Sequence, residues 1–451
     1  MIQKNILSHL LLGYFQLLER HSIAYCVIGN YEKLPEYTSN DVDFWVSDKE
    51  KAEKLLLSLA KELTIKLYMQ NKTANGTNNY FYYKHEEGNC QIIKIDLMTE
   101  TAYKSLVPLV SSTLIQNNRK KYKNFYVVNE EIEAIMHLFY PLVTFGIVKN
   151  KYREKLQKII KNQTFKTEVI GLMGTAYGDE LIDYIRVGEW EKIEKDFKKI
   201  RGKFIVRMLK NLNVKRLGIF MIFLKTIFTR IKNKNGLSIS FTGIDGAGKT
   251  SIKKYFVENS SLFFTSGRVK EFYWRPFLLP RVSKMIGSQG QKEILDTSGR
   301  RVIEKSIKNS VKNYIKYFYY ILDFVFGKLK YFVVTHTGGL VVFDRYHFDN
   351  IIYPERFGFK VNKVFMRFVD KWIIPQPDLL FYLTANTETL YERKYEIDID
   401  EINKQKEIYK DEIEKRGKII TVQTDGDFKT SVSDILEQCL FYMSQRIKDN
   451  G

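Results

Sequence analysis

Residues 243–250 constrain the fold more than any other segment of this 451-residue chain. They read GIDGAGKT and fit the pattern G-x-x-x-x-G-K-[ST]; the strand-like run LSISFT precedes them and the helix-compatible run SIKKYFVE follows. Glycines in such a loop let backbone N–H groups point at phosphate oxygens, and the helix start adds the positive end of its dipole. The segment therefore predicts a phosphate cradle between a strand and a helix.

Each residue type in the cradle has a chemical reason. Lys249 would neutralise the charge of the β- and γ-phosphates, and the Thr250 hydroxyl would bind Mg²⁺. ATP and Mg²⁺ are therefore the predicted cofactors. The residues expected to contact the nucleotide are Gly243, Asp245, Gly246, Ala247, Gly248, Lys249, Thr250 and Ser251.

Two later segments supply further candidates. LVVFDRYHF reads as a buried strand that ends at Asp344 and Arg345. A carboxylate at the end of a parallel strand would organise Mg²⁺, and the arginine beside it could hold an acceptor phosphate. Arg393 lies in a charged helical stretch that is either a mobile lid over the phosphates or a solvent-exposed helix with i,i+4 ion pairs.

Residues 237 to 445 resemble the thymidylate kinase family. FTGIDGAGKTS, FDRYHFD, PQPDLLFYL with ERK downstream, and TDGD occur in the family's order and spacing. The resemblance implies that ATP is the donor, that Lys249 and Arg393 stabilise the transferred phosphoryl group, that Arg345 holds the acceptor phosphate, and that Asp245 lies near the acceptor's sugar hydroxyl. With Asp344 from the strand pattern, the predicted catalytic residues are Lys249, Asp344, Arg345 and Arg393. EFYWRPFLLPR replaces the family's glycine-containing loop, with only Arg275-Pro276 retained, so the acceptor stays open between a nucleotide and a phosphorylated sugar.

The N-terminal part carries a second set of acidic residues. VIGNYEKLPEYTSNDVDFWV places Asp41 and Asp43 two positions apart, so both face the same side of a strand, and IIKIDLM adds Asp96 on a later strand. Three carboxylates that converge from neighbouring strands would hold Mg²⁺ against a nucleoside triphosphate.

Residues 1–130 resemble the minimal nucleotidyltransferase fold in their glycine-polar turn, DVD and IDL segments. Asn30 stands where that family usually has serine or glycine, so active transfer and binding without catalysis are both open. The predicted class is α/β: a nucleotidyltransferase-like α+β domain (1–130), a helical subdomain with a basic linker helix (131–235), and a P-loop-type parallel sheet flanked by helices (236–451). This tandem resembles two-domain proteins found with bacterial surface-polysaccharide genes, which implies a role in polysaccharide biosynthesis.

The net charge of +20, from 72 Lys and Arg against 52 Asp and Glu, favours anionic partners or serves solubility. Residues 198–234 are the most basic part and predict either a peripheral contact with an anionic membrane or a linker helix packed on a neighbouring domain. No nucleic-acid partner is expected, because no basic strand is interleaved with aromatic residues. Whether the chain forms a homodimer is left open.

Cys26, Cys90 and Cys439 are far apart and predict reduced, buried thiols in a cytoplasmic protein, with the inner membrane face as a second possible location. The leading hypothesis is an ATP- and Mg²⁺-dependent kinase joined to a nucleotidyltransferase-like domain, acting on a nucleotide or phosphorylated small molecule. The alternative is a nucleotide-gated scaffold at the membrane surface with degenerate catalytic domains.

Overall fold

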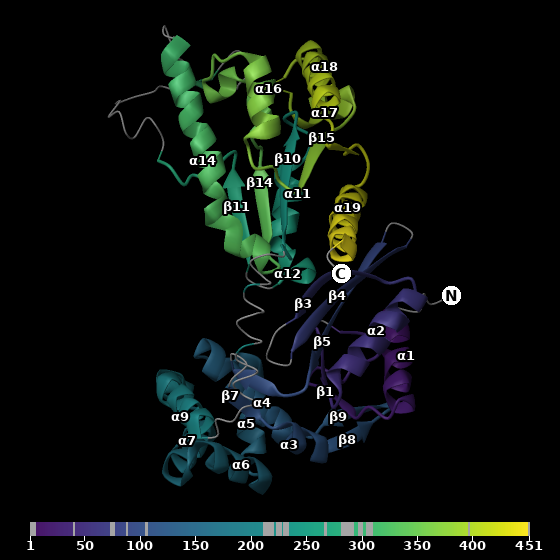
Figure 1. Cartoon of the computed structure of the whole chain (residues 1–451), viewed down its shortest axis with the longest axis vertical. Helices are drawn as coiled ribbons and strands as arrows, with labels where there is room; N and C mark the ends of the chain where they lie inside the picture. Colours follow the sequence, from purple (N-terminus) through teal and green to yellow (C-terminus); the bar gives the residue numbers. More distant parts are fainter. Residues whose placement is uncertain are drawn as a thin grey trace. The chain divides into compact units, whose positions relative to one another are not determined.

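The computed structural model describes residues 6–38, 41–72, 77–86, 89–103, 107–210, 221, 228, 234–265, 268–280, 293–295, 301–303, 310–395 and 397–449. The chain divides into two compact units, which Figure 1 draws together. The first unit contains Met1–Lys84 and Gln91–Thr229, and the second contains His85–Cys90 and Arg230–Gly451.

A five-stranded, fully parallel sheet forms the centre of the second unit. Its spatial order is β11-β14-β10-β15-β16. The strands are β10 (Leu237–Gly243), β11 (Val269–Tyr273), β14 (Leu340–Asp344), β15 (Leu379–Thr384) and β16 (Ile420–Gln423). Because β10 comes first in sequence and lies in the middle, the connections leave it toward both edges, and such a switch point opens a crevice at the carboxyl ends of the strands.

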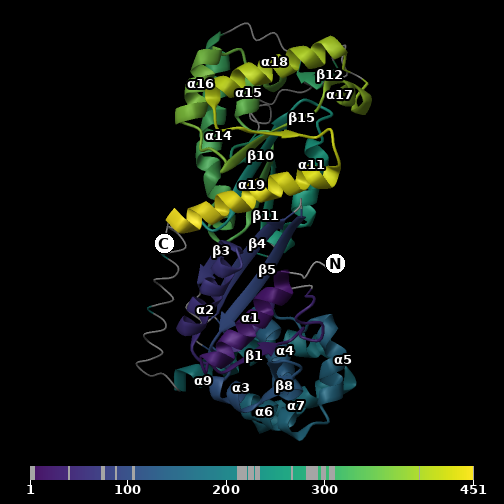
Figure 2. The ribbon, with the colours of Figure 1, turned by 90° about the vertical axis from the view of Figure 1, so that its right-hand side faces the viewer.

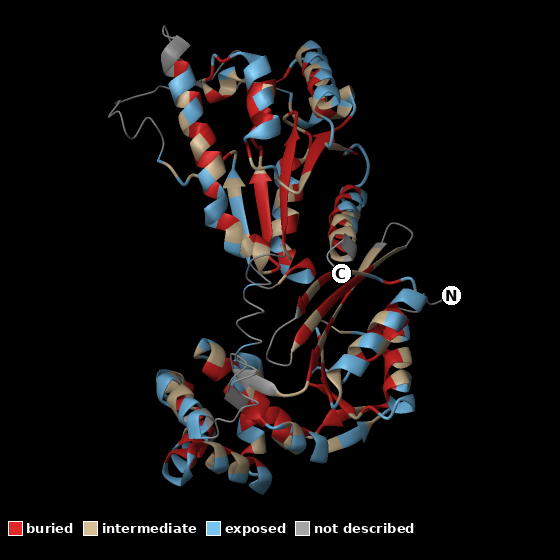
Figure 3. Cartoon of the chain, viewed as in Figure 1, coloured by how far each residue is buried: buried red, intermediate tan, exposed pale blue. Residues whose placement is uncertain are grey.

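Helices cover this sheet. All seven residues of β10 are buried, as are the first four of β14, so both strands are covered on both faces, and Figure 3 shows them in red between the helices. The helices are α11 (Lys249–Glu258), α12 (Ser260–Phe263), α14 (Ser310–His336), α15 (Phe348–Ile352), the 3₁₀ helix η1 (Glu355–Phe357), α16 (Lys363–Trp372), α17 (Thr387–Arg393), α18 (Ile399–Arg416) and α19 (Phe428–Asp449). A separate two-stranded ribbon pairs β12 (Glu293–Leu295) with β13 (Arg301–Ile303).

The first unit is built on a seven-stranded mixed sheet of order β3-β4-β5-β2-β1-β9-β8. Its strands are β1 (Tyr25–Ile28), β2 (Val42–Val46), β3 (Lys66–Lys72), β4 (Asn78–Glu86), β5 (Asn89–Met98), β8 (Arg119–Tyr122) and β9 (Phe125–Val128), with β6 (Thr101–Tyr103) and β7 (Val107–Val110) as a separate pair. β2 runs antiparallel to β1 and parallel to β5.

The two faces of this sheet bury two different cores. On β1, Tyr25 and Val27 belong to a core shared with α1 and α2, whereas Cys26 and Ile28 belong to a core shared with the later helices, as the period of two in a strand requires. Figure 2 shows α1 and α2 side by side against the sheet. The helices are α1 (Ile6–Arg20), α2 (Lys49–Glu62), α3 (Ser112–Asn117), α4 (Glu130–Phe145), α5 (Asn150–Ile159), α6 (Gln163–Met173), α7 (Thr175–Val187), α8 (Trp190–Lys195) and α9 (Phe197–Lys210).

The sequence-based predictions for the cysteines and for the basic segment can be compared with the structure. Cys26 and Cys439 are buried free thiols, but Cys90 is only partly buried, so the prediction of burial is wrong for that residue. Most of the basic segment 198–234 lies outside the described residues, which include only 198–210, 221, 228 and 234 of it. Among the helices that the structure describes, none combines the length and hydropathy that crossing a bilayer requires.

Candidate active site

The loop between β10 and α11 has the backbone of a phosphate cradle. Gly243 and Gly248 adopt φ values of 145° and 79°, which favour glycine. A Cβ on Gly243 would lie 2.2 Å from the carbonyl oxygen of Leu383 on β15, so only glycine fits there. The strand ends at Gly243 and the helix begins at Lys249, one residue later and two residues earlier than the runs LSISFT and SIKKYFVE predicted.

Lys249 lies inside this loop and is 8% exposed. Its ammonium donates hydrogen bonds to the carbonyl oxygens of Gly243 (2.9 Å) and Ile244 (2.7 Å). Burial and the charge of Arg345 together lower the pKa of Lys249 to about 8, although Asp245 opposes the shift. An anion in the cradle would therefore stabilise the protonated lysine.

Asp245 binds four cations from four different elements. Its carboxylate lies 2.6 Å from Arg345 Nη2, 3.4 Å from Lys249 Nζ, 3.4 Å from Arg356 Nη1 and 3.9 Å from Lys394 Nζ. Burial alone would raise the pKa of Asp245, but these four charges lower it well below its usual range. The carboxylate is consequently a fixed counterion and a very weak base.

Arg345 is held from two sides. It is 3% exposed, has a left-handed backbone (φ 71°), and its N–H donates to the carbonyl oxygen of Phe241 on β10. Nη1 donates to the fully buried Asp349 (2.9 Å) while Nη2 donates to Asp245. Asp349 also accepts a hydrogen bond from Thr242 Oγ1 (2.9 Å), so the orientation of the guanidinium is tied to the central strand.

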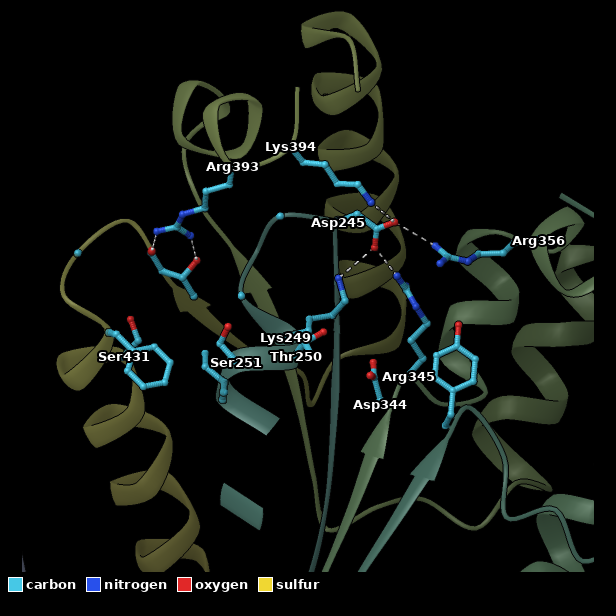
Figure 4. A pocket seen from close by; sticks show the side chains of 17 residues that line it. Asp245, Lys249, Thr250, Ser251, Asp344, Arg345, Arg356, Arg393, Lys394 and Ser431 are labelled. Carbon is cyan, nitrogen blue, oxygen red and sulfur yellow. Dashed lines mark hydrogen bonds and ion pairs between the residues drawn. The ribbon is translucent and has the colours of Figure 1, made fainter. Parts of the chain in front are cut away.

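These residues line a pocket of about 580 Å³ at the carboxyl ends of the strands (Figure 4). Five cationic side chains and two carboxylates face it, so the pocket carries an excess of positive charge that suits phosphates. The lining consists of Asp245, Gly246, Gly248, Lys249, Thr250, Ser251, Ile252, Tyr273, Asp344, Arg345, Arg356, Arg393, Lys394, Thr424, Gly426, Phe428 and Ser431.

Thr250 and Asp344, the predicted Mg²⁺ residues, both line this pocket. A hydroxyl and a carboxylate are the oxygen ligands that Mg²⁺ prefers, and Mg²⁺ commonly takes one or two protein ligands together with phosphates and water. Asp344 also pairs with Lys253 at 3.3 Å. The donor set therefore fits the ion.

Arg393 also faces the pocket, at the end of α17. Its guanidinium donates to the carbonyl oxygen of Thr424 (2.7 Å) and to its hydroxyl (3.3 Å), in the loop after β16. The side chain therefore links the end of α17 to the loop after β16.

In the first unit, Asp41, Asp43 and Asp96 converge as the sequence predicted. Each offers a carboxylate oxygen within 4.8 Å of the others. Asp43 and Asp96 are direct partners in the register of the parallel strands β2 and β5. Both face the side of the sheet that carries Trp45 and Met98, which belong to the core with the helical part.

Burial and, after it, mutual repulsion raise the pKa values of the carboxylates in this second cluster. Burial raises the pKa of Asp43, and the charges of Asp96 and Asp41 raise it further, while Lys149 and Lys151 partly oppose this. Burial and the charge of Asp41 likewise raise the pKa of Asp96. A divalent cation would relieve the repulsion, so the donor set fits Mg²⁺ here as well.

Sequence reasoning missed several pocket residues of the second unit. Arg356, Lys394 and Tyr273 come from a 3₁₀ turn, from the residue after α17 and from the end of an edge strand. No local pattern distinguishes them from surface residues. Asp349 belongs to the FDRYHFD segment. It follows Arg345 by four residues near the start of a helix, and this spacing could have predicted the ion pair between them.

Comparison with known proteins gives a limited result. No protein-family model matches the chain, and no curated protein matches its sequence. Among solved structures, the chain is similar to the thymidylate kinase of Ehrlichia chaffeensis at 15% identity and TM-score 0.30, over 46% of this chain and 98% of that chain. It is also similar to the thymidylate kinase of Candida albicans at 18% identity and TM-score 0.32, over 47% and 93% respectively.

Similarity at this level indicates no substrate. The parallel sheet with its switch point at β10, the glycine-lined cradle before α11 and the acidic residue at the end of β14 together give the second unit a P-loop kinase-like fold.

Proposed function

We propose that the second unit is an ATP- and Mg²⁺-dependent phosphotransferase of the nucleoside monophosphate kinase type, acting on a nucleotide or a phosphorylated sugar. The observation that carries this proposal is the pocket in which Lys249, Arg345 and Arg393 surround the cradle at the switch point of the sheet. A cation-lined crevice with backbone donors positions phosphates and stabilises their developing charge, which is most of what phosphoryl transfer requires.

Five side chains that line the pocket have roles in the proposed mechanism. Bound Mg²⁺ would neutralise charge on the β- and γ-phosphates from its place at Thr250 and Asp344. Lys249 holds the transferred phosphoryl group, and Arg345 orients the acceptor so that one of its oxygens lies in line with the bond to the leaving ADP oxygen. Arg393 exchanges its bonds to Thr424 for the transferring oxygens when the nucleotide binds.

The test is Mg²⁺-dependent ADP formation by the purified chain with dTMP, other nucleoside monophosphates and sugar phosphates. ADP formation that requires one of these acceptors, and that is lost in Lys249→Ala, supports the kinase and identifies the acceptor class. ATP binding without turnover on any acceptor contradicts it and favours the nucleotide-gated scaffold instead.

We further propose that the first unit is a nucleotidyltransferase-like domain whose Asp41, Asp43 and Asp96 hold Mg²⁺ for a nucleoside triphosphate. The convergence of the three carboxylates supports this. So does the charge of Lys149 and Lys151, which acts on Asp43 from the start of α5 and could bind phosphates. Together the two activities would suit the synthesis of a glycan precursor.

This second function has its own test. Release of pyrophosphate from each nucleoside triphosphate is measured in the Lys249→Ala background, with sugar phosphates as acceptors. Turnover that disappears in Asp43→Asn supports active transfer. Nucleotide binding without turnover shows a domain that only binds, and absence of both contradicts the assignment.

A further inference from the structure

Tyr273 and Arg356 line the pocket but have no role yet in the proposed transfer. Tyr273 is the last residue of β11 and is the direct register partner of Asp344. It is 50% exposed and lines the same pocket as Arg345. A half-exposed aromatic ring beside a phosphate-binding arginine offers an apolar face to the part of a ligand that carries the phosphate.

Arg356 is the second unassigned residue. It lies in η1 and lines the pocket, where its Nη1 is 3.4 Å from Asp245 Oδ2. Its side chain is 32% exposed, in contrast to 3% for Arg345. Because this contact is longer and more exposed than the Arg345 contact, Arg356 can exchange Asp245 for a ligand phosphate at little cost.

A ring stack connects the two residues. Trp274, which follows Tyr273, stacks on Phe357, which follows Arg356, with centroids 4.7 Å apart and ring planes 24° apart. The indole N–H of Trp274 donates to Asn350 Oδ1 at 2.7 Å. The stack therefore fixes the edge of β11 and the η1 turn relative to each other.

Other contacts fix the same corner. Trp274 has φ 65°, and its backbone N–H donates to the carbonyl oxygen of Asp344, while Lys316 donates to the carbonyl oxygens of Phe357 (3.3 Å) and Gly358 (3.1 Å). The corner that presents Tyr273 is therefore ordered before any ligand binds, which lowers the entropy cost of binding.

The neighbouring Arg275 cannot serve the acceptor. It is 0% exposed and pairs with the fully buried Asp323 at 2.5 Å, beneath the rings of Phe277 and Tyr320. The sequence retains an Arg275-Pro276 pair at this place, but the arginine faces the interior and does not line the pocket.

We propose that Tyr273 and Arg356 bind the acceptor, and this inference rests on the proposed phosphotransfer. Arg356 joins Arg345 on the acceptor's phosphate, so the acceptor is a phosphate monoester. Tyr273 covers the first ring of its carbon skeleton.

The phosphoryl group of ATP then passes to an oxygen of the acceptor's phosphate, with a P–O bond formed there and the bond to the ADP oxygen broken. No general base is needed, because the monoester is already an anion.

The test is calorimetric titration of dTMP and glucose 1-phosphate into the full chain with Mg²⁺ and a non-hydrolysable ATP analogue. Arg356→Ala should weaken monoester binding about 10–100-fold, the range for hydrogen bonds to charged groups. Tyr273→Ala should weaken it about 3–10-fold, while Tyr273→Phe stays near wild type because the ring is retained. Affinity for the ATP analogue should not change. Arg268→Ala and Tyr37→Ala, which remove exposed side chains outside the pocket, are the matched controls.

The outcomes separate this inference from the proposed function. Equal monoester binding by wild type, Arg356→Ala, Arg356→Gln and Tyr273→Ala overturns the inference even if Lys249-dependent transfer occurs. Failure of wild type to bind either monoester also overturns it. Binding that depends on Arg356 but leads to no transfer with ATP supports the acceptor site and contradicts the kinase.

Discussion

The two candidate sites handle charge in opposite ways. In the second unit, the carboxylate of Asp245 is surrounded by four cations and its pKa is lowered. In the first unit, Asp43 and Asp96 oppose each other across paired strands, and the pKa of each is raised. The pocket of the second unit thus has a surplus of positive charge and requires an anion, whereas the first unit has a surplus of negative charge and requires a cation.

Under the proposed functions, the two units would supply different things to a reaction with nucleotides. The second unit fixes its donors before the ligand arrives, since Lys249 and Arg345 already make hydrogen bonds inside the protein. The first unit instead brings carboxylates together, and the Mg²⁺ proposed there would relieve their repulsion. Stability should therefore respond to anions in one unit and to divalent cations in the other.

The largest effect that sharpens this comparison is expected from Lys249→Ala. Loss of a preorganised cation at the transferring phosphoryl group should lower kcat about 10²–10³-fold. Steady-state ADP formation with the active acceptor measures it. Lys254→Ala on the same helix, which removes an exposed lysine paired with Glu258, should leave kcat unchanged. Equal loss in both variants would show a defect of α11 and not of the cradle.

Asp349→Asn tests whether the orientation of Arg345 depends on the buried charge of Asp349. The substitution keeps the shape but removes a charged hydrogen bond to Arg345, so the free energy of unfolding should fall by about 1.5–3 kcal/mol. The KM for the acceptor should rise while the KM for ATP stays unchanged. Denaturant unfolding and initial rates measure both. A stable variant with wild-type KM would show that Asp245 alone orients Arg345.

The pH dependence of ATP binding tests the buried lysine. The pKa of Lys249 is about 8 without ligand, so the ammonium is lost as pH rises through that value. Affinity for ATP should be constant below pH 8 and then fall by up to about tenfold per pH unit. Equilibrium titration from pH 6.5 to 9.5 measures this, and an affinity independent of pH across that range contradicts the assigned shift.

The smallest expected effect concerns the first unit. The pKa of Asp96 is raised to about 7, so between its ordinary value near ~4 and pH 7 the folded state binds more protons than the unfolded state, and stability falls as pH rises through this window. Asp96→Asn removes this titrating carboxyl and, without metal, should raise the Tm by about 2–4 °C relative to wild type at pH 8. Mg²⁺ should raise the Tm of wild type only. If the Tm of both proteins changed with pH in the same way between pH 4 and 8, the result would contradict the proposed repulsion between the carboxylates.

The cradle could be predicted from the sequence because all its parts are local. Gly243, Gly248 and Lys249 are fixed by the strand, the turn and the helix that flank them, and the structure has each element where the pattern indicated. The alternation in DVD also sufficed to place Asp41 and Asp43 on one face, although the partnership with Asp96 depends on the register of two strands far apart in sequence.

The acceptor side could not be predicted because it is assembled by tertiary contacts. Arg356 gains its position from the stack of Phe357 on Trp274, and neither aromatic residue belongs to a periodic pattern that indicates the contact. Arg275 shows the reverse case, because the sequence retains an arginine whose side chain the fold buries against Asp323. Charge alone could not tell these two arginines apart.

The most direct measurement is single-turnover transfer of the labelled γ-phosphoryl group from ATP to a phosphate monoester, with wild type and the Lys249→Ala and Lys254→Ala variants. The account predicts that the label appears on the monoester with Mg²⁺ present, at equal rates for wild type and Lys254→Ala and at a rate lower by about 10²–10³-fold for Lys249→Ala. Label that stays on ATP, or that passes to the acceptor equally fast without Lys249, would contradict it.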